Sequence, residues 1–334
     1  MKNEESINII SLCAKQKGIS GPKKVFDNLV KGLDQLGHPY VVNRPLNSTR
    51  RLWIQDDLAA LTKSSFLNKT TLLGPNLVVF PGELPLKYPC PRSLYLQPGP
   101  WAADIWRLEG FDLCPLKVWP VGIDTEEFFA RTVSLKDAPI LVYYKNRAPD
   151  QLELLKGTLD KQRMPYQLIT YGVYQEKDYK KLLHQCSFMI WIGRHESQGI
   201  ALQEALSVGV PIFVLDATSL FEEYPLRPDQ FPERLRNFKT TCVPYFDERC
   251  GIVINSLTMI EEGLFQMHQQ FDKFRPREFI LENLSLKKQA LEFCNFFLEL
   301  ESTCNKNDSV NAAGTGSYLS RLAMNLWNRL NCHE

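Results

Sequence analysis

Two glutamates, Glu196 and Glu204, stand with seven residues between them at the start of a strongly apolar stretch. If residues 200–208 form a helix, apolar side chains cover most of its surface and leave only a narrow polar edge. Glu204 must lie on or beside this edge. A carboxylate on so apolar a helix is costly unless it has partners, and the hydroxyls of a ribose would supply them. Glu196 lies before the helix, in a loop whose amides can also meet a diphosphate. The alternative is that both glutamates are simply solvated.

A second candidate is the loop that contains Gly18 and Gly21, between an apolar strand pattern and a helix pattern that stops at Gly37. Glycines let the backbone approach a ligand closely, and the start of a helix offers unpaired N–H groups to an anion. The spacing is not G-x-G-x-x-G, and Asn43 and Arg44 stand where a dinucleotide site would have an acid. An NAD-linked oxidoreductase is therefore a weak alternative. The alternative for this loop is that it forms only a tight turn and binds no ligand.

The elements that must position these residues form two series in which strands and helices alternate. The first series has predicted strands at 7–13, 39–43, 76–80, 93–96 and 116–119. The second has strands at 139–144, 166–171, 186–192 and 210–215, with helices at 149–162, 175–185 and 199–208. Between the second and third strands, residues 44–75 give only weak signals. The alternation predicts an α/β fold with two doubly wound, Rossmann-like domains, in which ligands bind beyond the carboxyl ends of the strands.

The expected domains are residues 1–122 and 123–301, followed by a third segment at 302–334. Residues 302–316 are rich in Ser, Asn, Gly, Thr and Asp and are predicted to form a polar linker. Apolar residues in 319–330 then recur at helical spacing, which predicts an amphipathic C-terminal helix. We expect this helix to dock on one of the domains, and peripheral membrane contact through it is the alternative.

Composition excludes several other classes of protein. The 334 residues include 39 Lys+Arg and 38 Asp+Glu, so the net charge of +1 lacks the basic footprint of a nucleic-acid-binding protein. The nine cysteines form no C-x-x-C pair, which is typical of a reduced compartment. The polar, acidic N-terminus does not resemble a signal peptide, and no run approaches the ~20 apolar residues of a membrane span. We therefore expect a cytoplasmic protein.

Several motifs, taken in order, resemble those of a known family. The pattern from Glu196 to Glu204, with Gly199 inside it and Gly-Val-Pro after it, is similar to the signature of retaining, nucleotide-sugar-dependent glycosyltransferases of family 4. Residues 119–128 resemble that family's domain junction, and residues 18–38 resemble its N-terminal glycine loop, helix and stop. A strand that leads to Arg147 is a further match. The resemblance implies the GT-B fold, in which two Rossmann-like domains face a cleft.

The resemblance also implies roles for individual residues. Glu204 would bind the ribose of the donor, Glu196 would contact its sugar, and Arg147 would meet its diphosphate. The helix start at Gly199 and the loop from Gly18 to Gly21 would help to stabilise the diphosphate charge. Further donor-binding candidates are Ser197, Gln198, His195 and Lys145. The implied substrates are a nucleotide sugar and a glycan, lipid or protein acceptor, with no metal ion and no other cofactor.

Some positions depart from the family pattern. Leu152 stands where relatives usually have a diphosphate-binding lysine, so Lys145 or Lys156 would have to replace it. The histidine that relatives often place near the reacting sugar has no clear counterpart, since His38 belongs to the helix stop, and Glu83 is a candidate for that side of the cleft. These departures keep open a second function, that of a non-catalytic protein that binds nucleotide sugars.

Overall fold

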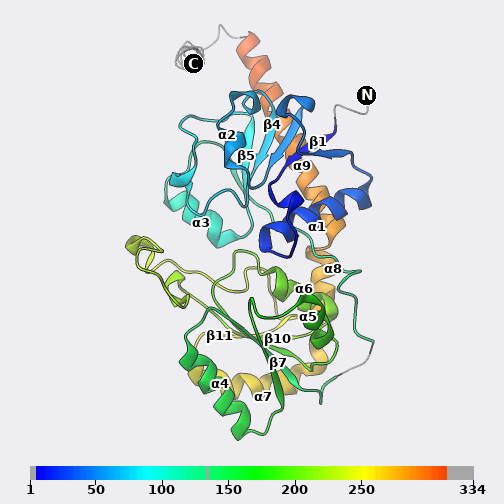
Figure 1. The fold of residues 1–334 in the computed structure, drawn as a ribbon, viewed down its shortest axis with the longest axis vertical. Coiled ribbons are helices and arrows are strands. Elements are labelled where there is room, and N and C mark those ends of the chain that lie inside the picture. The colour runs from blue at the N-terminus through cyan, green and yellow to red at the C-terminus, as the bar shows by residue number, and fades with distance from the viewer. Residues whose placement is uncertain (1–4, 133–134, 314–334) are drawn as a thin grey trace.

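The computed structural model describes residues 5–132 and 135–313, and within them the chain forms two parallel sheets, one above the other in Figure 1. The six-stranded sheet has the order β2-β1-β3-β4-β5-β6 and the five-stranded sheet the order β11-β10-β9-β7-β8. The strands of the first sheet are β1 Ile7–Ile10, β2 Tyr40–Val42, β3 Arg51–Ile54, β4 Thr70–Leu73, β5 Ser93–Gln97 and β6 Leu116–Val118. Those of the second are β7 Ile140–Lys145, β8 Tyr166–Thr170, β9 Met189–Gly193, β10 Ile212–Leu215 and β11 Gly251–Ile254.

Helices cover these sheets, as the predicted α/β fold requires. They are α1 Gly21–Leu36, α2 Leu58–Leu61, α3 Pro100–Leu108, α4 Pro149–Lys161, α5 Glu176–Leu183, α6 Ile200–Val208, α7 Ile260–Gln270, α8 Pro276–Asn283 and α9 Leu286–Ala313. The fold class is confirmed by the two parallel sheets.

Helix α1 forms where its capping residues predict it. The Ser20 hydroxyl accepts a hydrogen bond from the backbone N–H of Lys23, and Pro22 occupies the first turn. Gly37 ends the helix with a φ of 64°, a left-handed conformation that favours glycine. The helix therefore begins directly after the glycine loop, and its first turn lies beside that loop.

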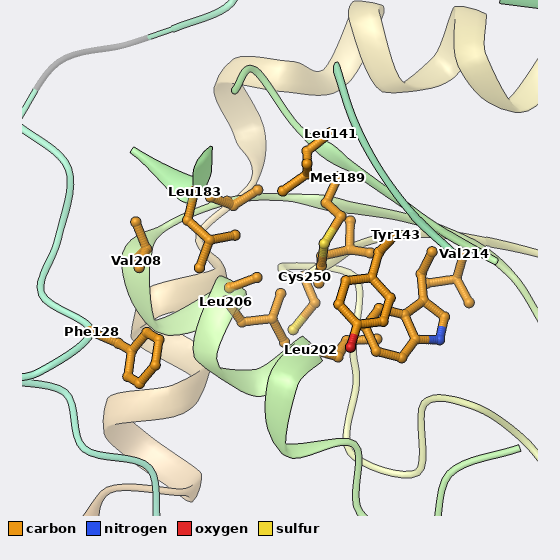
Figure 2. Close-up of a cluster of buried hydrophobic side chains, with 14 of the residues drawn as sticks. Phe128, Leu141, Tyr143, Leu183, Met189, Leu202, Leu206, Val208, Val214 and Cys250 are labelled. Carbon is orange, nitrogen blue, oxygen red and sulfur yellow. The ribbon is translucent and has the colours of Figure 1, made fainter. Parts of the chain in front are cut away.

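Strand β9 and helix α6 carry the central loop of the second domain. All five residues of β9 are buried, and the strand pairs in parallel with β7 on one side and β10 on the other. Figure 2 shows Leu202, Leu206 and Val208 of α6 among apolar side chains of the second domain. The ends of β7 and β9 lie at the same edge, because Lys145 is in register with Gly193.

Helix α9 returns from the second domain to the first, and Figure 1 shows it running along the first sheet. Phe293 and Phe297 are fully buried in a cluster with residues of α1 and of the first sheet. Gly32 of α1 permits this packing, since a Cβ there would lie 2.8 Å from the Cβ of Ala290. The last helix described is thus part of the core of the first domain.

Two sequence predictions fail in this region or near it, and a third is not tested. Residues 302–313 continue α9 and are not a linker, because the packed helix before them propagates the hydrogen-bonding pattern cooperatively. Residues 76–80 are not a strand; β3 and β4 lie instead within 44–75, where polar side chains mask the strand pattern. The amphipathic helix predicted at 319–330 lies outside the described residues, as does its expected docking on a domain or the alternative of membrane contact.

The packing of α9 is testable with two neighbouring residues. Phe297→Ala should lower the free energy of unfolding by about 3–5 kcal/mol, because it leaves a cavity in the core. Leu298→Ala, at a side chain that is 54% exposed, should change it by only about 0.5 kcal/mol. Urea unfolding followed by circular dichroism measures both, and equal losses would show that α9 does not pack as described.

Candidate functional site

Glu204 is buried on α6, at the place where α6 meets α1 of the first domain. Its side chain is 3% exposed, and its Oε1 accepts a hydrogen bond of 2.5 Å from Lys24 Nζ. The same ammonium donates to Glu176 Oε1 of α5 at 2.9 Å. The second oxygen, Glu204 Oε2, is buried and has no hydrogen-bond partner in the described part of the protein. A carboxylate on an apolar helix thus presents one free acceptor, as its setting in the sequence predicts.

The surroundings of Glu204 also change its acidity. Burial raises its pKa from 4.5 to about 7, and the Glu176 carboxylate adds to this rise, whereas the Lys24 charge opposes it. Burial disfavours the charged ammonium of Lys24, but the two carboxylates outweigh it and raise the lysine pKa. Lys24 therefore stays charged and holds the second-domain carboxylates close to α1.

Glu196 and Lys145 form an ion pair at the carboxyl ends of β7 and β9. Lys145 Nζ lies 2.5 Å from Glu196 Oε1 and 4.4 Å from the centre of the Tyr171 ring. The two side chains are 11% and 12% exposed, so the pair is largely shielded from water. A cation and a carboxylate are thus brought together at the edge where parallel sheets bind ligands.

Arg147 is 2% exposed, and its guanidinium binds groups of the protein itself. Nη1 donates to the carbonyl oxygens of Gly193 and Asp216, each at 3.1 Å, and Nε donates to Gln151 at 2.9 Å. Nη2 lies 3.0 Å from Glu222 Oε2. These contacts tie the end of β9 to the end of β10. Contact of Arg147 with a diphosphate stays a prediction, and the observed geometry gives its guanidinium a positioning role.

Gln198 and Ser197 lie where the second domain contacts the first. The Gln198 side chain accepts from the N–H of Val121 at 3.0 Å and donates to the carbonyl of Val121 at 2.8 Å. A Cβ on Gly99 would lie 1.9 Å from the Ser197 carbonyl oxygen, so this contact requires glycine. Binding of the donor by these two residues stays a prediction. In this structure, Gln198 fastens the loop to the domain junction.

His195 is almost fully buried in the same loop. Its ring packs edge-on against Trp101, whose indole N–H donates to the Glu196 carbonyl at 2.9 Å. His195 Nε2 lies 3.5 Å from Glu223 Oε2, and Arg194 donates to the other carboxylate oxygen at 2.7 Å. Burial alone would raise the pKa of Glu223, but the contact with His195, the Arg194 charge and a hydrogen bond from Asn146 together lower it to about 2. The histidine therefore sits in a structural cluster one residue from Glu196.

Of the three glycines of the predicted site, two have a backbone conformation that favours glycine. Gly199 precedes α6 with a φ of 81°, and Gly18 has a φ of 101°, so both occupy the left-handed region. Gly21 begins α1, and a Cβ there would meet no atom within 4 Å. The same is true of Gly18. Among the described residues, nothing packs against these two positions, and contact of the loop with a donor stays a prediction.

No protein-family model matches the chain, and no curated protein matches it. Solved structures do. Sucrose-phosphate synthase from Thermosynechococcus elongatus has a TM-score of 0.57 at 10% identity, over 90% of this chain and 100% of that one. The catalytic domain of starch synthase IV from Arabidopsis thaliana, bound to ADP and acarbose, has a TM-score of 0.56 at 9% identity, over 90% and 100%. Anabaena Alr3699/HepE in complex with UDP and glucose has a TM-score of 0.55 at 10% identity, over 89% and 100%.

The chain has the GT-B fold. The resemblance stated from the sequence motifs is confirmed at this level, since the similarity extends over about nine-tenths of the chain. At such low identity, the similarity shows the fold and leaves the activity to be argued from the site.

The departures from the family pattern are explained by where the GT-B fold places each residue. Leu152 lies in the apolar cluster beneath α4, where a lysine would be buried. Lys156 lies on the same helix and pairs with Glu153 at 2.9 Å. Lys145, in contrast, lies against Glu196. Of the two lysines considered as replacements, Lys145 is thus the one at the candidate site.

Two residues considered for the acceptor side have local roles. Glu83 is exposed and accepts a hydrogen bond of 3.2 Å from the N–H of Val79, within its own turn. His38 follows the end of α1, with Nδ1 3.1 Å from the carbonyl oxygen of Pro39.

Sequence reasoning missed Lys24, Glu176 and Tyr171. Lys24 is one of two lysines in the first turn of α1, and nothing in the sequence indicates that α1 packs against α6. Glu176 begins a polar helix, where a solvated acid is the ordinary expectation. Tyr171 directly follows β8. An aromatic residue at the carboxyl end of a strand was the one feature of the sequence that could have placed it near the candidate site.

Two features are absent from the described residues. Residues 5–132 and 135–313 contain no group of three or more His, Cys, Asp or Glu side chains placed to hold a metal ion. Among the helices of the same residues, none is both long and apolar enough to cross a membrane.

The acidity of Glu204 predicts how stability depends on pH. Between its unfolded pKa near 4.5 and its folded value of about 7, the folded chain retains a proton that the unfolded chain has lost. Stability should therefore fall as the pH rises through this window, by at most roughly 3 kcal/mol from this group. Glu204→Gln should show a smaller fall. Urea unfolding at pH 5, 6, 7 and 8 measures the difference, with the exposed Glu153→Gln as the control; parallel curves for wild type and Glu204→Gln would contradict it.

Proposed function

We propose that the protein is a glycosyltransferase that moves a sugar from a nucleoside diphosphate to an acceptor hydroxyl, with retention at the anomeric carbon and without a metal ion. One observation carries the proposal: Glu204, on the helix that follows the loop of the Lys145–Glu196 pair, holds a buried oxygen that has no hydrogen-bond partner among the described residues. The UDP and glucose of the Anabaena structure, and the ADP of the starch synthase domain, support a nucleotide sugar as the donor.

In the proposed complex, the ribose hydroxyls meet Glu204 and the transferred sugar meets Glu196. The diphosphate lies between them, against Lys145 and the first amides of α6, which have no partner within the helix. The Gly18 to Gly21 loop approaches the diphosphate from the first domain. Such a placement uses both charges of the Lys145–Glu196 pair and fills the free acceptor on Glu204.

The proposed reaction breaks the bond between the anomeric carbon and the leaving phosphate oxygen. The acceptor oxygen forms its bond on the same face, and its proton passes to the departing diphosphate. Negative charge grows on the diphosphate during this step, and a nearby ammonium and a helix start stabilise it. Lys145 supplies the ammonium, and contact of the domains around the donor limits access of water.

A second candidate is a protein that binds nucleotide sugars without transferring them. It is favoured by Arg147, whose guanidinium is buried against two carbonyls, Gln151 and Glu222. An arginine that already balances an acid inside the protein adds little to stabilisation of a leaving group.

Binding and turnover separate these two candidates. Thermal shift with UDP, GDP, ADP and their glucose or N-acetylglucosamine forms, in excess EDTA, should show stabilisation by one nucleoside diphosphate and its sugars. Release of the diphosphate from that donor should then be measurable. Glu196→Ala should lower the release rate by about 100-fold while the affinity for the diphosphate is retained. Binding with no release in the presence of glycan, lipid and peptide acceptors would favour the second candidate, and a strict need for a divalent metal would contradict the proposed chemistry.

Lys145 and Lys156 form a matched pair for a second prediction. Lys145→Met should reduce kcat for release of the diphosphate by about 100-fold, equivalent to ~3 kcal/mol of lost charge stabilisation. Lys156→Met should leave kcat within about twofold, because this side chain lies on the surface of α4 beside Glu153. Steady-state kinetics measures both, and similar kcat values for the two variants would exclude Lys145 from the charge stabilisation.

A further inference from the structure

Lys24 connects the two domains at the position of the unpartnered acidic oxygen. It belongs to α1 of the first domain, and both of its ion-pair partners, Glu204 and Glu176, belong to the second. Its side chain is 19% exposed, so the contact is shielded and is not an ordinary surface ion pair. An ammonium has three N–H donors, and the two carboxylates take two of them.

The leftover groups form a complementary pair. Lys24 has a third N–H beyond its two bonds to carboxylates, and its Nζ lies 5.7 Å from the centre of the Phe128 ring. Glu204 Oε2 is a buried acceptor that has no hydrogen-bond partner among the described residues. Two adjacent hydroxyls fit these groups, since one can donate to the carboxylate while the other accepts from the ammonium. Each of these bonds involves a charged partner and is therefore stronger than a neutral one.

We propose that Lys24 and Glu204 together bind the vicinal diol of the donor ribose, so that the ribose site is assembled from both domains. The inference rests on the proposed function and adds to it a first-domain residue and a requirement on the ligand. The donor must carry both ribose hydroxyls, and it binds fully only when α1 lies against α6.

The charge of Lys24 also keeps Glu204 suited to this task. A buried carboxyl without a cation favours the protonated form, whose lone pairs accept a weaker hydrogen bond. Removal of Lys24 should thus weaken both hydroxyl contacts at once: one directly, and one through Glu204. A role restricted to holding the domains together would instead weaken all ligands equally.

The test compares ribose with its dideoxy form. Isothermal titration calorimetry gives Kd for UDP, ADP and their 2′,3′-dideoxy analogues with wild type, Lys24→Met, Lys24→Arg and Lys23→Met. Lys23 is the matched control, because it neighbours Lys24 on α1 but pairs with Asp27 of the same helix. For wild type, the nucleotide that binds should do so at least tenfold more tightly than its dideoxy analogue.

We expect Lys24→Met to weaken the ribonucleotide about tenfold and to leave the dideoxy analogue within twofold, so that the preference for ribose disappears. Lys24→Arg keeps the charge and should restore most of the preference, and Lys23→Met should keep all of it. Retained binding of the dideoxy analogue shows that the variant is folded. Equal weakening of both ligands by Lys24→Met, or no weakening, would overturn the inference while the proposed function stands. If wild type binds none of these nucleotides and GDP does not bind either, both the inference and the proposed function are overturned.

Discussion

The position of Glu196 depends on the close contact between the loop after β9 and the first domain. The contact is specific at three points, since Gly99 admits the Ser197 carbonyl, Trp101 donates to the Glu196 carbonyl, and Gln198 binds both backbone groups of Val121. A backbone that is fixed on both sides has little freedom to turn Glu196 away from Lys145. A loop has no regular hydrogen-bonding pattern of its own to hold it rigid, so contacts with the opposite domain fix its conformation.

The same two domains are joined by two chain crossings that pack on each other. The first passes through Gly122, where a Cβ would lie 2.6 Å from the Cα of Leu286 at the start of α9, the second crossing. Ile123 donates to the carbonyl of Leu284 at 2.7 Å, and Trp119 donates to that of Gln289 at 3.0 Å. Because the crossings are adjacent, motion of one domain against the other must turn about this point. Helix α1 touches this point as well, since Asn28, one turn after Lys24, donates to the carbonyl of Gly122 at 2.8 Å. The contact of Lys24 with Glu204 therefore lies close to the point about which the domains turn.

The sequence predicts local features of this fold well and contacts between distant segments poorly. Helix α1 and its limits follow from Ser20, Pro22 and Gly37, which act within a few residues of themselves. The burial of Glu204 follows from the apolar residues of its own helix. Strand β4 and residues 302–313 could not be assigned in the same way, because their structure depends on the sheet and on the helix packed beside them. The role of Lys24 could not be predicted either, since its ion-pair partners lie more than 150 positions away along the chain.

Arg147 shows why a motif position and a chemical role can separate. The resemblance assigns the diphosphate to the arginine after β7, but here that guanidinium joins the ends of β9 and β10 and is balanced by Glu222. Lys145, two residues earlier, carries the cation at the strand end and is balanced by Glu196. A diphosphate that approaches Lys145 must therefore compete with Glu196 for the ammonium. If hydroxyls of the donor sugar form hydrogen bonds with the Glu196 carboxylate, they replace Lys145 as its partner, and the ammonium is then free to bind the phosphates. Recognition of the sugar and stabilisation of the leaving group would thus be linked through one ion pair.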